Sequence, residues 1–478
     1  MTSTFSGFSI ARSGIFASQR ALNVNSHNIA NANTPGYTRQ RLDVSPSNPI
    51  ILGNGQGVMG TGVDTDNISQ IRDEFLDLRY RDENTTFGEW EARSDILKYV
   101  ENIFNEPSDS GVQKVSDNFF NSLQELSKGA DDLSTRALVR ESAISFTTSV
   151  KHMVHQFETL QKDTDFEITA TVNQINGYAE EIAKLNEAIR ISELDGSKAN
   201  DLRDERNLLL DELSELVNVD YYEDGNQRFS VLLNGRPLVS HDKTNKLTYS
   251  KRNTELNSYD AVGLHEVQWE DDIKFKPKSG KLKGLIDMRD NISGEEKGIP
   301  YYMERLNHFT AVFAEEMNNI HRGGFTLNGT TGIDLFTFNP ADAAKSISIS
   351  NDIEDDLANI AASSIATGLP QNGENALRMA DARHDSTLYG WGSPEDFFAS
   401  MVSNLGVDRQ GAIRMVKNGS VLLNQVEANR QSISGVSLDE EMANMIQFQH
   451  SFNANSRMIT TMDEMIDTII NRMGIVGR

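Results

Sequence analysis

The sequence predicts a mainly α-helical protein with inserted β segments, built as an elongated rod. Apolar residues recur every seven positions near both ends of the chain, which predicts that the N- and C-terminal helices pair as a coiled coil. Long helical segments lie inside these ends, and stretches rich in strand and turn residues lie in the middle. The chain would therefore fold back on itself, with a helical bundle body and a small β-rich outer domain.

Length and composition limit the possible functions. A chain of 478 residues suggests two or three domains. Its net charge of −25 argues against sequence-independent binding to nucleic acid. It contains no cysteine, which excludes disulfides and thiolate chemistry. Without a run of eighteen apolar residues or the basic and apolar regions of a cleaved signal, these rules alone predict a cytoplasmic protein with no membrane insertion.

The C-terminal repeat covers residues 438–478. A capping box, Ser437 with Glu440, marks its start, and Gly474 marks its end. Positions four residues after each repeat position form a second seam, in which apolar and polar residues alternate irregularly. Asn455 belongs to neither seam and is expected to lie outside the contact. The alternative is an amphipathic core helix. The six repeat positions are all large and apolar: Leu438, Met445, Phe452, Ile459, Ile466 and Met473.

The N-terminal helix is the expected partner of this repeat. Residues 1–42 carry four arginines and no acid, whereas residues 438–478 carry six acids and three arginines, so opposite charges favour pairing. The seam three residues after the apolar one is small, which permits close approach of a bulkier helix. The apolar seam is Phe8, Ile15, Leu22 and Ile29, and the small one is Ala11, Ser18, Asn25 and Ala32.

The interior of the chain reads as a bundle with β insertions. Helical periodicity dominates 76–218 and returns at 300–322 and 393–432, with a break expected near Gly406. Strand patterns and tight turns mark 219–299 and 323–392. The predicted division is a terminal coiled-coil assembly domain (1–75 plus 433–478), a helical body (76–218, 300–322 and 393–432) and β-rich outer segments (219–299 and 323–392).

No catalytic constellation is apparent. The glycine-rich run at 53–63 lacks the flanking elements and the Gly-Lys-Ser/Thr of a phosphate loop, so a hairpin is expected there. His152 and His155 have no further metal ligands at helical spacing nearby. The run 384–386 (His-Asp-Ser) is not a triad, because triad members converge in space rather than in sequence. We therefore expect no enzyme activity, no metal and no cofactor.

The segment following the N-terminal helix is more specific. Residues 28–41 read NIANANTPGYTRQR, in which proline and glycine end the helix in a turn. The segment resembles the Asn-rich ANxxTPGY motif shared by the axial proteins of the bacterial flagellum, which include rod, hook and hook-associated proteins. The matching positions are Ala30, Asn31, Thr34, Pro35, Gly36 and Tyr37.

Further segments resemble one branch of these proteins, the hook-associated protein 1 family of hook–filament junction proteins. They read DLRDERNLLLDELSELV (201–217), NGRPLVSH (234–241), GFTLNGTTGIDLF (324–336) and SGVSLDEEMANMIQFQHSFNANSRMITTMDEMIDTIINRMG (434–474). The resemblance covers most of the chain and is weakest over 240–300 and 340–392. The alternatives are another axial protein, from the hook or distal rod, and an enzyme such as a hydrolase.

The resemblance implies a structural subunit that forms a ring at the junction between hook and filament and is required for filament assembly and motility. The implied partners are other copies of the chain, the hook protein, a second hook–filament junction protein and a flagellar export chaperone. The chaperone would hold the C-terminal apolar seam. Family members leave the cell through the flagellar export apparatus without a cleaved signal, which replaces the cytoplasmic expectation with an extracellular one.

Overall fold

The computed structural model describes residues 6–51, 57–104, 111–294, 296–390 and 392–472. The chain forms two compact units. Unit 1 contains residues 1–84, 175–246 and 419–478, and unit 2 contains residues 85–174 and 247–418. Three long helices contribute to both units: α2 (Glu74–Phe104), α4 (Leu133–Ser192) and α11 (Pro394–Ser434).

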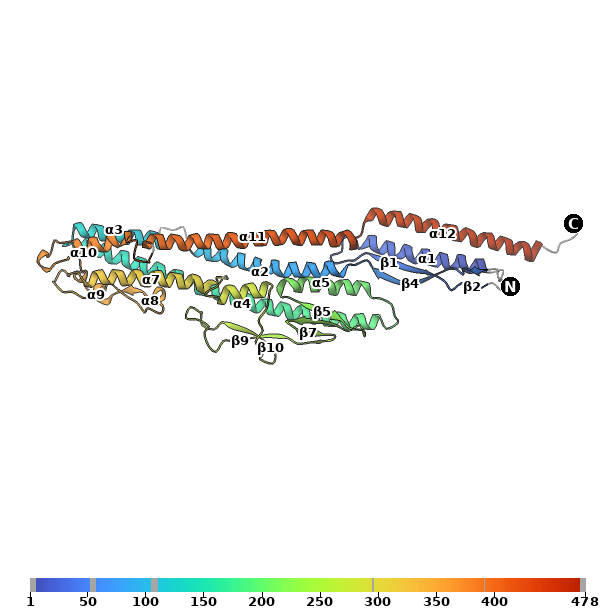
Figure 1. Cartoon of the computed structure of the whole chain (residues 1–478), viewed down its shortest axis with the longest axis horizontal. Helices are drawn as coiled ribbons and strands as arrows, with labels where there is room; N and C mark the ends of the chain where they lie inside the picture. The colour runs from blue at the N-terminus through green and yellow to red at the C-terminus, as the bar shows by residue number, and fades with distance from the viewer. Residues whose placement is uncertain (1–5, 52–56, 105–110, 295, 391, 473–478) are drawn as a thin grey trace. The chain divides into compact units, whose positions relative to one another are not determined.

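The two ends of the chain lie together in unit 1. Helix α1 (Ser6–Ala30) packs along α12 (Leu438–Asp467), which continues into a short π-helical turn, η4 (Thr468–Arg472). A two-stranded antiparallel sheet also packs on α1; it consists of β1 (Gln40–Pro46) and β4 (Val63–Gln70). Strands β2 (Ile50–Ile51) and β3 (Val58–Met59) pair as the expected hairpin, whose residues 52–56 lie outside the described part. Figure 1 shows α1 and α12 side by side.

The rest of unit 1 combines helices with a β meander. Helix α5 (Asn200–Leu216) accompanies the unit 1 portions of α2, α4 and α11. Four antiparallel strands follow it in sequence order. Asn234 and Gly235 adopt φ angles of 53° and 82°, as a tight hairpin turn between the second and third strands requires. The strands are β5 (Asp220–Glu223), β6 (Phe229–Leu233), β7 (Arg236–Ser240) and β8 (Lys243–Thr244).

Unit 2 is organised around α7 (Ile299–Arg322), which has a proline in its first turn. Phe309 and Phe313 on this helix join a buried aromatic cluster with Phe119, Phe146 and Phe336. The other helices are α3 (Val112–Lys128), α6 (Lys281–Asp290), α8 (Ala343–Ser346), α9 (Asn351–Asp355) and α10 (Glu374–Asp381), with 3-10 turns η1 (Leu357–Asn359), η2 (Ala366–Gly368) and η3 (Ala382–His384). Two small sheets pair β9 (Leu247–Lys251) with β10 (His265–Trp269) and β11 (Phe336–Thr337) with β12 (Ser348–Ile349).

A buried histidine connects three segments of unit 2. The Nδ1 atom of His321 lies 2.7 Å from the carbonyl oxygen of Ile333, and its Nε2 accepts the N–H of Ala361 at 2.9 Å. A ring that accepts at Nε2 donates from Nδ1 and is neutral. Burial lowers the pKa of His321 to about 4, because the charged form would lose its hydration.

The predicted fold class, mainly α-helical with inserted β segments and a long C-terminal helix, is confirmed. The compact units divide the chain differently from the predicted domains: β5–β8 belong to unit 1 and β9–β12 to unit 2. The expected break near Gly406 is wrong, since α11 runs through this residue without interruption. A single glycine costs a helix only about 1 kcal/mol, which a helix of 41 residues tolerates. Within the described residues, no helix is long and apolar enough to cross a membrane.

Candidate interaction site on the terminal helices

The terminal helices pair in an antiparallel heptad register. A Cβ atom added to Gly7 would lie 2.0 Å from Met462 Cε, and one added to Gly14 would lie 2.7 Å from Asn455 Nδ2. Further along α1, the Nδ2 atom of Asn28 donates to Glu441 Oε2 at 3.2 Å. A step of seven residues toward the C-terminus of α1 therefore corresponds to a step of seven residues toward the N-terminus of α12. At Gly7 and Gly14, small residues of α1 face larger residues of α12.

Small and polar residues of α1 form its buried face. Three of the four positions of the predicted small seam, Ala11, Ser18 and Asn25, are buried, which confirms close approach at this seam. Ala21 is also buried and lines the same cavity of about 600 Å³ as Phe448 on α12. The fourth predicted position, Ala32, lies beyond the end of α1.

The second contact row of α12 differs from the predicted one. It lies three residues after the apolar repeat positions rather than four, and Asn455 is part of it. Residues three and four positions apart on a helix are both neighbours, so either row could have faced α1. The row four residues after the repeat positions was predicted because its apolar members suggested the contact. The actual row mixes polar and apolar residues, and α1 donates hydrogen bonds to its first member. The row is Glu441, Phe448, Asn455 and Met462.

The predicted apolar seams lie beside this contact and remain partly accessible. On α1, Phe8 is 38% exposed, and Ile15, Leu22 and Ile29 are half-buried. On α12, Leu438 is 49% exposed, and the other described positions are half-buried: Met445, Phe452, Ile459 and Ile466. Met473 lies outside the described residues.

A buried carboxylate holds the start of α12. Glu441 is only 2% exposed. Its carboxylate accepts hydrogen bonds from Arg39 Nε at 2.8 Å, from Asn28 Nδ2 at 3.2 Å and from Asn25 Nδ2. Asn25 also donates to the backbone carbonyl of Glu441 at 2.9 Å. A buried charge is tolerated only when it is paired and hydrogen-bonded, and this one has partners from α1 and from the segment after it.

Arg39 contacts both sides of the junction between α11 and α12. Its backbone N–H donates to the carbonyl of Ser434, the last residue of α11, at 2.8 Å. Its guanidinium bonds Glu440 as well as Glu441 in the first turn of α12. Between the helices, a Cβ atom at Gly435 would lie 2.4 Å from the carbonyl oxygen of Gln431, so the chain requires glycine there. Arg39 therefore bridges the junction at which α12 begins.

The predicted capping box is confirmed on one side. The Ser437 hydroxyl accepts the N–H of Glu440 at the start of α12, which satisfies one backbone donor of the first turn. The Glu440 side chain instead bonds Arg39.

The Asn-rich motif forms the turn that leads from α1 to β1. Gly36 adopts a φ of 75°, which favours glycine, and the Thr34 N–H donates to the Asn31 carbonyl at 2.9 Å. Asn28 Oδ1 accepts from the Tyr37 hydroxyl at 2.8 Å and from the Gln40 N–H at 3.0 Å. Burial, together with nearby carboxylates, raises the pKa of Tyr37, so its hydroxyl keeps the proton that it donates. Ala30 ends α1, and Pro35 is exposed in the turn.

A second carboxylate anchors the segment after the motif. Asp204 on α5 accepts the backbone N–H of Thr38 at 2.9 Å and a guanidinium N–H of Arg72 at 3.3 Å. Burial raises the pKa of Asp204 to about 6, although these hydrogen bonds oppose the shift. The turn is therefore held from α5 as well as from α12.

Sequence reasoning missed Asn28, Arg39 and Glu441 and did not recognise the polar role of Asn25. The available signal was Glu441, a charged residue three positions after a repeat position of the C-terminal helix. Such a residue is either exposed or paired with a distant partner, and the sequence does not show which.

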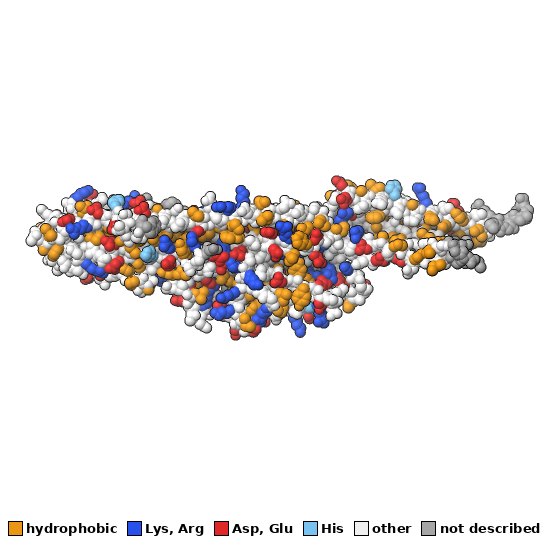
Figure 2. All heavy atoms as spheres, viewed as in Figure 1, with side chains coloured by type: hydrophobic (Ala, Val, Ile, Leu, Met, Phe, Trp, Pro, Cys, Tyr) orange, Lys and Arg blue, Asp and Glu red, His pale blue; other side chains and the backbone are white. Residues whose placement is uncertain are grey.

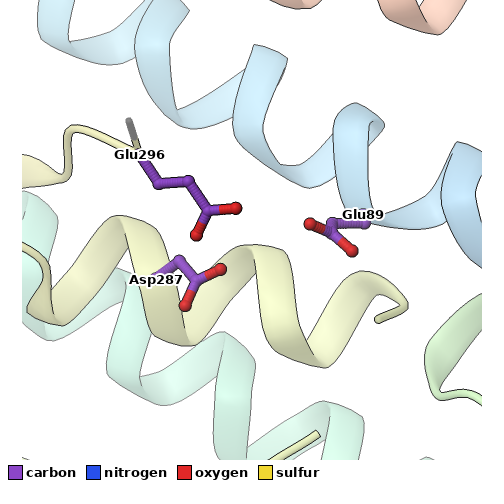
Figure 3. A group of neighbouring side chains, drawn as sticks. All are labelled: Glu89, Asp287 and Glu296. Atoms are coloured by element: carbon purple, nitrogen blue, oxygen red, sulfur yellow. The ribbon is translucent and has the colours of Figure 1, made fainter. Parts of the chain in front are cut away.

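One carboxylate group in unit 2 has the composition of a metal site. Among the described residues, ligand oxygens of Glu89, Asp287 and Glu296 lie within 4.8 Å of one another (Figure 3). A guanidinium nitrogen of Arg93 lies 2.6–2.8 Å from all three carboxylates. Lys283 Nζ lies 2.9 Å from Glu89 and 2.8 Å from Asp287. These cations occupy the oxygens that a metal would need, so the group is an ion-pair network.

The carboxyls of this network differ in their proton affinity. Burial raises the pKa of Asp287 to about 6, and hydrogen bonding to Glu296 adds to the shift. Although burial opposes it, hydrogen bonds from Arg93 and Asp287 lower the pKa of Glu296 to about 2. Glu296 is therefore ionised around neutral pH and carries the charge that pairs with Arg93.

Comparison with known proteins agrees with this architecture. Residues 8–38 match the family model described as flagella basal body rod protein. Residues 428–473 match the model described as flagellar basal body rod FlgEFG protein C-terminal. Both ends of the chain, which the structure pairs, thus match the class of flagellar basal body rod proteins.

The middle of the chain identifies the particular family. Residues 97–336 match the model described as flagellar hook-associated protein FlgK helical domain. The flagellar hook-associated protein 1 of Bacillus subtilis (strain 168) is 35% identical over 100% of both chains. That of Escherichia coli (strain K12) is 26% identical over 96% of this chain and 98% of its own length. The chain belongs to the flagellar hook-associated protein 1 family.

A solved structure shows the same fold. The flagellar hook junction protein FlgK from Burkholderia pseudomallei has a TM-score of 0.63 to this chain. The match covers 75% of this chain and 100% of that one, at 14% sequence identity.

Proposed function

We propose that this chain is a structural subunit of the bacterial flagellum that forms the junction between hook and filament and is required for filament assembly and motility. The observation that carries the proposal is the full-length match to hook-associated protein 1 of Bacillus subtilis. The paired terminal helices, which match rod-type models, add a physical basis for assembly into an axial structure.

Its partners follow from this role. They are other copies of the chain in a ring, the hook protein, a second hook–filament junction protein and an export chaperone. The chain acts outside the cell, which it leaves through the flagellar export apparatus without a cleaved signal. It binds no nucleic acid, consistent with its net charge of −25, and acts as a building element rather than as an enzyme, with no cofactor.

The assembly elements are assigned to the two ends. The terminal assembly domain comprises 1–75 and 433–478, the helical body 76–218, 300–322 and 393–432, and the outer segments 219–299 and 323–392. The motif at 30–37 holds the turn between α1 and β1. The apolar seams of α1 and α12 are the assembly surfaces, and the C-terminal seam is also the surface that the chaperone covers before export.

A complementation experiment tests the proposal. Cells lacking the chain are expected to build hooks, to release unpolymerised filament subunits into the medium and not to swim. The wild-type chain restores filaments. Cells without hooks would instead favour the alternative of a hook or distal rod protein, and filaments of normal number and length in the deletion strain would refute both.

A second measurement locates the chain in the flagellum. Because the sequence has no cysteine, a cysteine introduced at exposed Asn453 provides one site for a gold label. Electron microscopy should place the label at the boundary between hook and filament. Label distributed along the whole hook or rod would contradict the proposed position.

A further inference from the structure

Asn-Gly pairs are sites at which a protein backbone can modify itself. The glycine nitrogen can attack the Cγ atom of the preceding asparagine, because a glycine without a Cβ atom hinders this approach least. The reaction requires the asparagine to rotate about ψ, so regular structure and hydrogen bonds oppose it. The chain contains six such pairs, of which only the first lies outside the described residues: 54–55, 176–177, 234–235, 328–329, 372–373 and 418–419.

Helices and a hairpin hold three of the five described pairs. Asn176 lies inside α4 and Asn418 inside α11, where the hydrogen bonds of the helix fix the backbone. Asn234 lies in the tight turn between β6 and β7, and its Oδ1 atom accepts a hydrogen bond from Asn218 Nδ2 at 3.3 Å. At these three pairs the asparagine cannot rotate without loss of the surrounding structure.

Packing and hydrogen bonds hold a fourth pair. The Oδ1 atom of Asn372 accepts the backbone N–H groups of Ser364 and Glu374, both at 3.1 Å. A Cβ atom added to Gly373 would lie 2.1 Å from the carbonyl oxygen of Ser127, so this glycine is packed against the end of α3. Both the asparagine amide and the backbone that would attack it are therefore fixed.

The remaining pair lies in an exposed loop of unit 2. The Thr326 N–H donates to the Thr330 carbonyl at 2.9 Å, and the Gly329 N–H donates to the Thr326 carbonyl at 3.0 Å, which closes a three-residue loop. Gly329 has a φ of 80°, the left-handed conformation that such a loop uses. Asn328 is exposed, and within the described residues its side-chain amide has no hydrogen-bond partner. A short exposed loop opens locally at less cost than a helix or a packed turn.

We propose that Asn328 is a site of spontaneous deamidation through a cyclic imide. The Gly329 nitrogen forms a bond to Asn328 Cγ, the bond from Cγ to Nδ2 breaks, and Nδ2 leaves as ammonia with the proton that the Gly329 nitrogen gives up. Water then adds to one of the two imide carbonyl carbons, breaks its bond to the glycine nitrogen and returns a proton to that nitrogen. Opening at Cγ gives aspartate, and opening at the backbone carbonyl carbon gives isoaspartate; no oxidant or reductant takes part.

The two products affect the loop differently. Each adds one carboxylate, which changes the net charge from −25 to −26. Figure 2 shows acidic and basic side chains mixed over the visible face of the molecule, so one more carboxylate creates no region of a single charge. Isoaspartate also adds a methylene group to the backbone, which the hydrogen bonds between Thr326 and Thr330 do not accommodate. Because Leu327 donates to the Ala358 carbonyl at 3.0 Å, the loosened loop also affects the segment that contains Ala358.

This inference goes beyond the proposed function and gives it a consequence. A subunit that has left the cell is beyond the reach of cytoplasmic enzymes, so the modified fraction should rise with the age of the flagellum. The reaction itself depends only on the loop. Absence of the chain from isolated flagella would therefore refute the proposed function and leave the deamidation site to be decided on the purified chain.

Peptide mapping of the purified wild-type chain by mass spectrometry tests the site. During incubation at mildly alkaline pH, deamidation at Asn328 should be roughly tenfold or more faster than at the four other described pairs, because local opening limits those pairs. In urea the five rates should converge. A native rate at Asn328 no higher than at the other pairs would overturn the proposal, as would rates that keep their native ranking in urea. A product that contains aspartate but no isoaspartate would overturn the cyclic imide.

Two variants separate the charge from the change in the backbone. Asn328→Gln should stay unmodified over the same incubation, because its side chain would have to close a larger ring. Asn328→Asp carries the added carboxylate on an unaltered backbone, so amide exchange in 326–330 should match the wild type. The isolated isoaspartate form should exchange faster there and at the wild-type rate in α7. Equal exchange in the isoaspartate form and in Asn328→Asp would refute the effect of the added methylene group.

Discussion

Removal of the Glu441 carboxylate should release the start of α12 from α1 without unfolding the rest of the protein. In Glu441→Ala, Arg39, Asn25 and Asn28 lose the acceptor that their side chains share. These donors belong to α1 and to the segment that leads into β1, so the loss affects both terminal helices. Asp439→Ala is the control: this acid lies in the same first turn, is exposed, and contributes only through the helix dipole, by about 0.3–1 kcal/mol.

The expected magnitude follows from these contacts. Breaking a buried ion pair by removing one partner costs about 3–5 kcal/mol. Arg39 keeps its bond to Glu440, and its side chain is 18% exposed, so water replaces part of the lost interaction. Asn25 keeps its bond to the backbone carbonyl of residue 441. The low end of the range therefore applies, and local opening of the pair should become easier by about 3 kcal/mol.

Amide hydrogen exchange measures this opening segment by segment. A loss of about 3 kcal/mol corresponds to exchange roughly 150-fold faster in α1 and α12, since each 1.4 kcal/mol is a factor of ten. Amides of α7 in unit 2 should exchange at the wild-type rate. Acceleration below fivefold in α1 and α12 would show that the carboxylate contributes little, and equal acceleration in α7 would show that the variant destabilises the whole chain.

Three further predictions concern other parts of the chain. Because burial lowers the pKa of His321 from 6.5 to about 4, the unfolded chain binds a proton at a higher pH than the folded chain does, and unit 2 should lose roughly 3 kcal/mol of stability as the pH falls from 6.5 to 4. In urea unfolding, the stability of His321→Gln should lack this dependence on pH. Gly284→Ala places a Cβ atom 2.5 Å from a backbone carbonyl of α2 and should cost about 1–3 kcal/mol, whereas Gly406→Ala, with no atom within 4 Å, should stabilise α11 by about 0.5–1 kcal/mol; calorimetry showing equal effects would refute the steric argument. Ile459→Asp should abolish filament assembly at an unchanged melting temperature, while Asn453→Asp should assemble normally; electron microscopy showing filaments on Ile459→Asp cells would contradict the assembly role of the seam.

The seven-residue pattern predicted the terminal helices well because it depends only on the period of the helix. The same pattern left the second contact row ambiguous. Positions three and four residues after a repeat position are both neighbours, and apolarity favoured Met442 over Glu441. The actual row contains Glu441 and Asn455, whose partners on α1 lie more than 400 residues away in sequence. No local pattern reports such a partner.

Local turn chemistry was predictable for a related reason. Gly36 and the pair Asn234 and Gly235 adopt positive φ angles, which glycine and asparagine tolerate better than other residues. The residue types themselves therefore indicate the turns. Gly406 shows the limit of this reasoning. Its conformational freedom favours a break, but the helix on either side of it continues, and the summed propensity and packing of many residues exceed the cost of one glycine.

The buried polar contact also explains how a pair of repeating helices selects one register. A slip of seven residues would place Gly14 opposite Phe448 and leave small residues facing large ones along most of the pair. The same slip would place Glu441 opposite Ala21, where the carboxylate would have no donor and its burial would cost several kcal/mol. Buried polar residues in coiled coils fix register in this way, at some expense of stability. The Asn-rich segment supplies the donor Asn28 and holds it through Tyr37, so the segment that forms the turn also aligns the two ends of the chain.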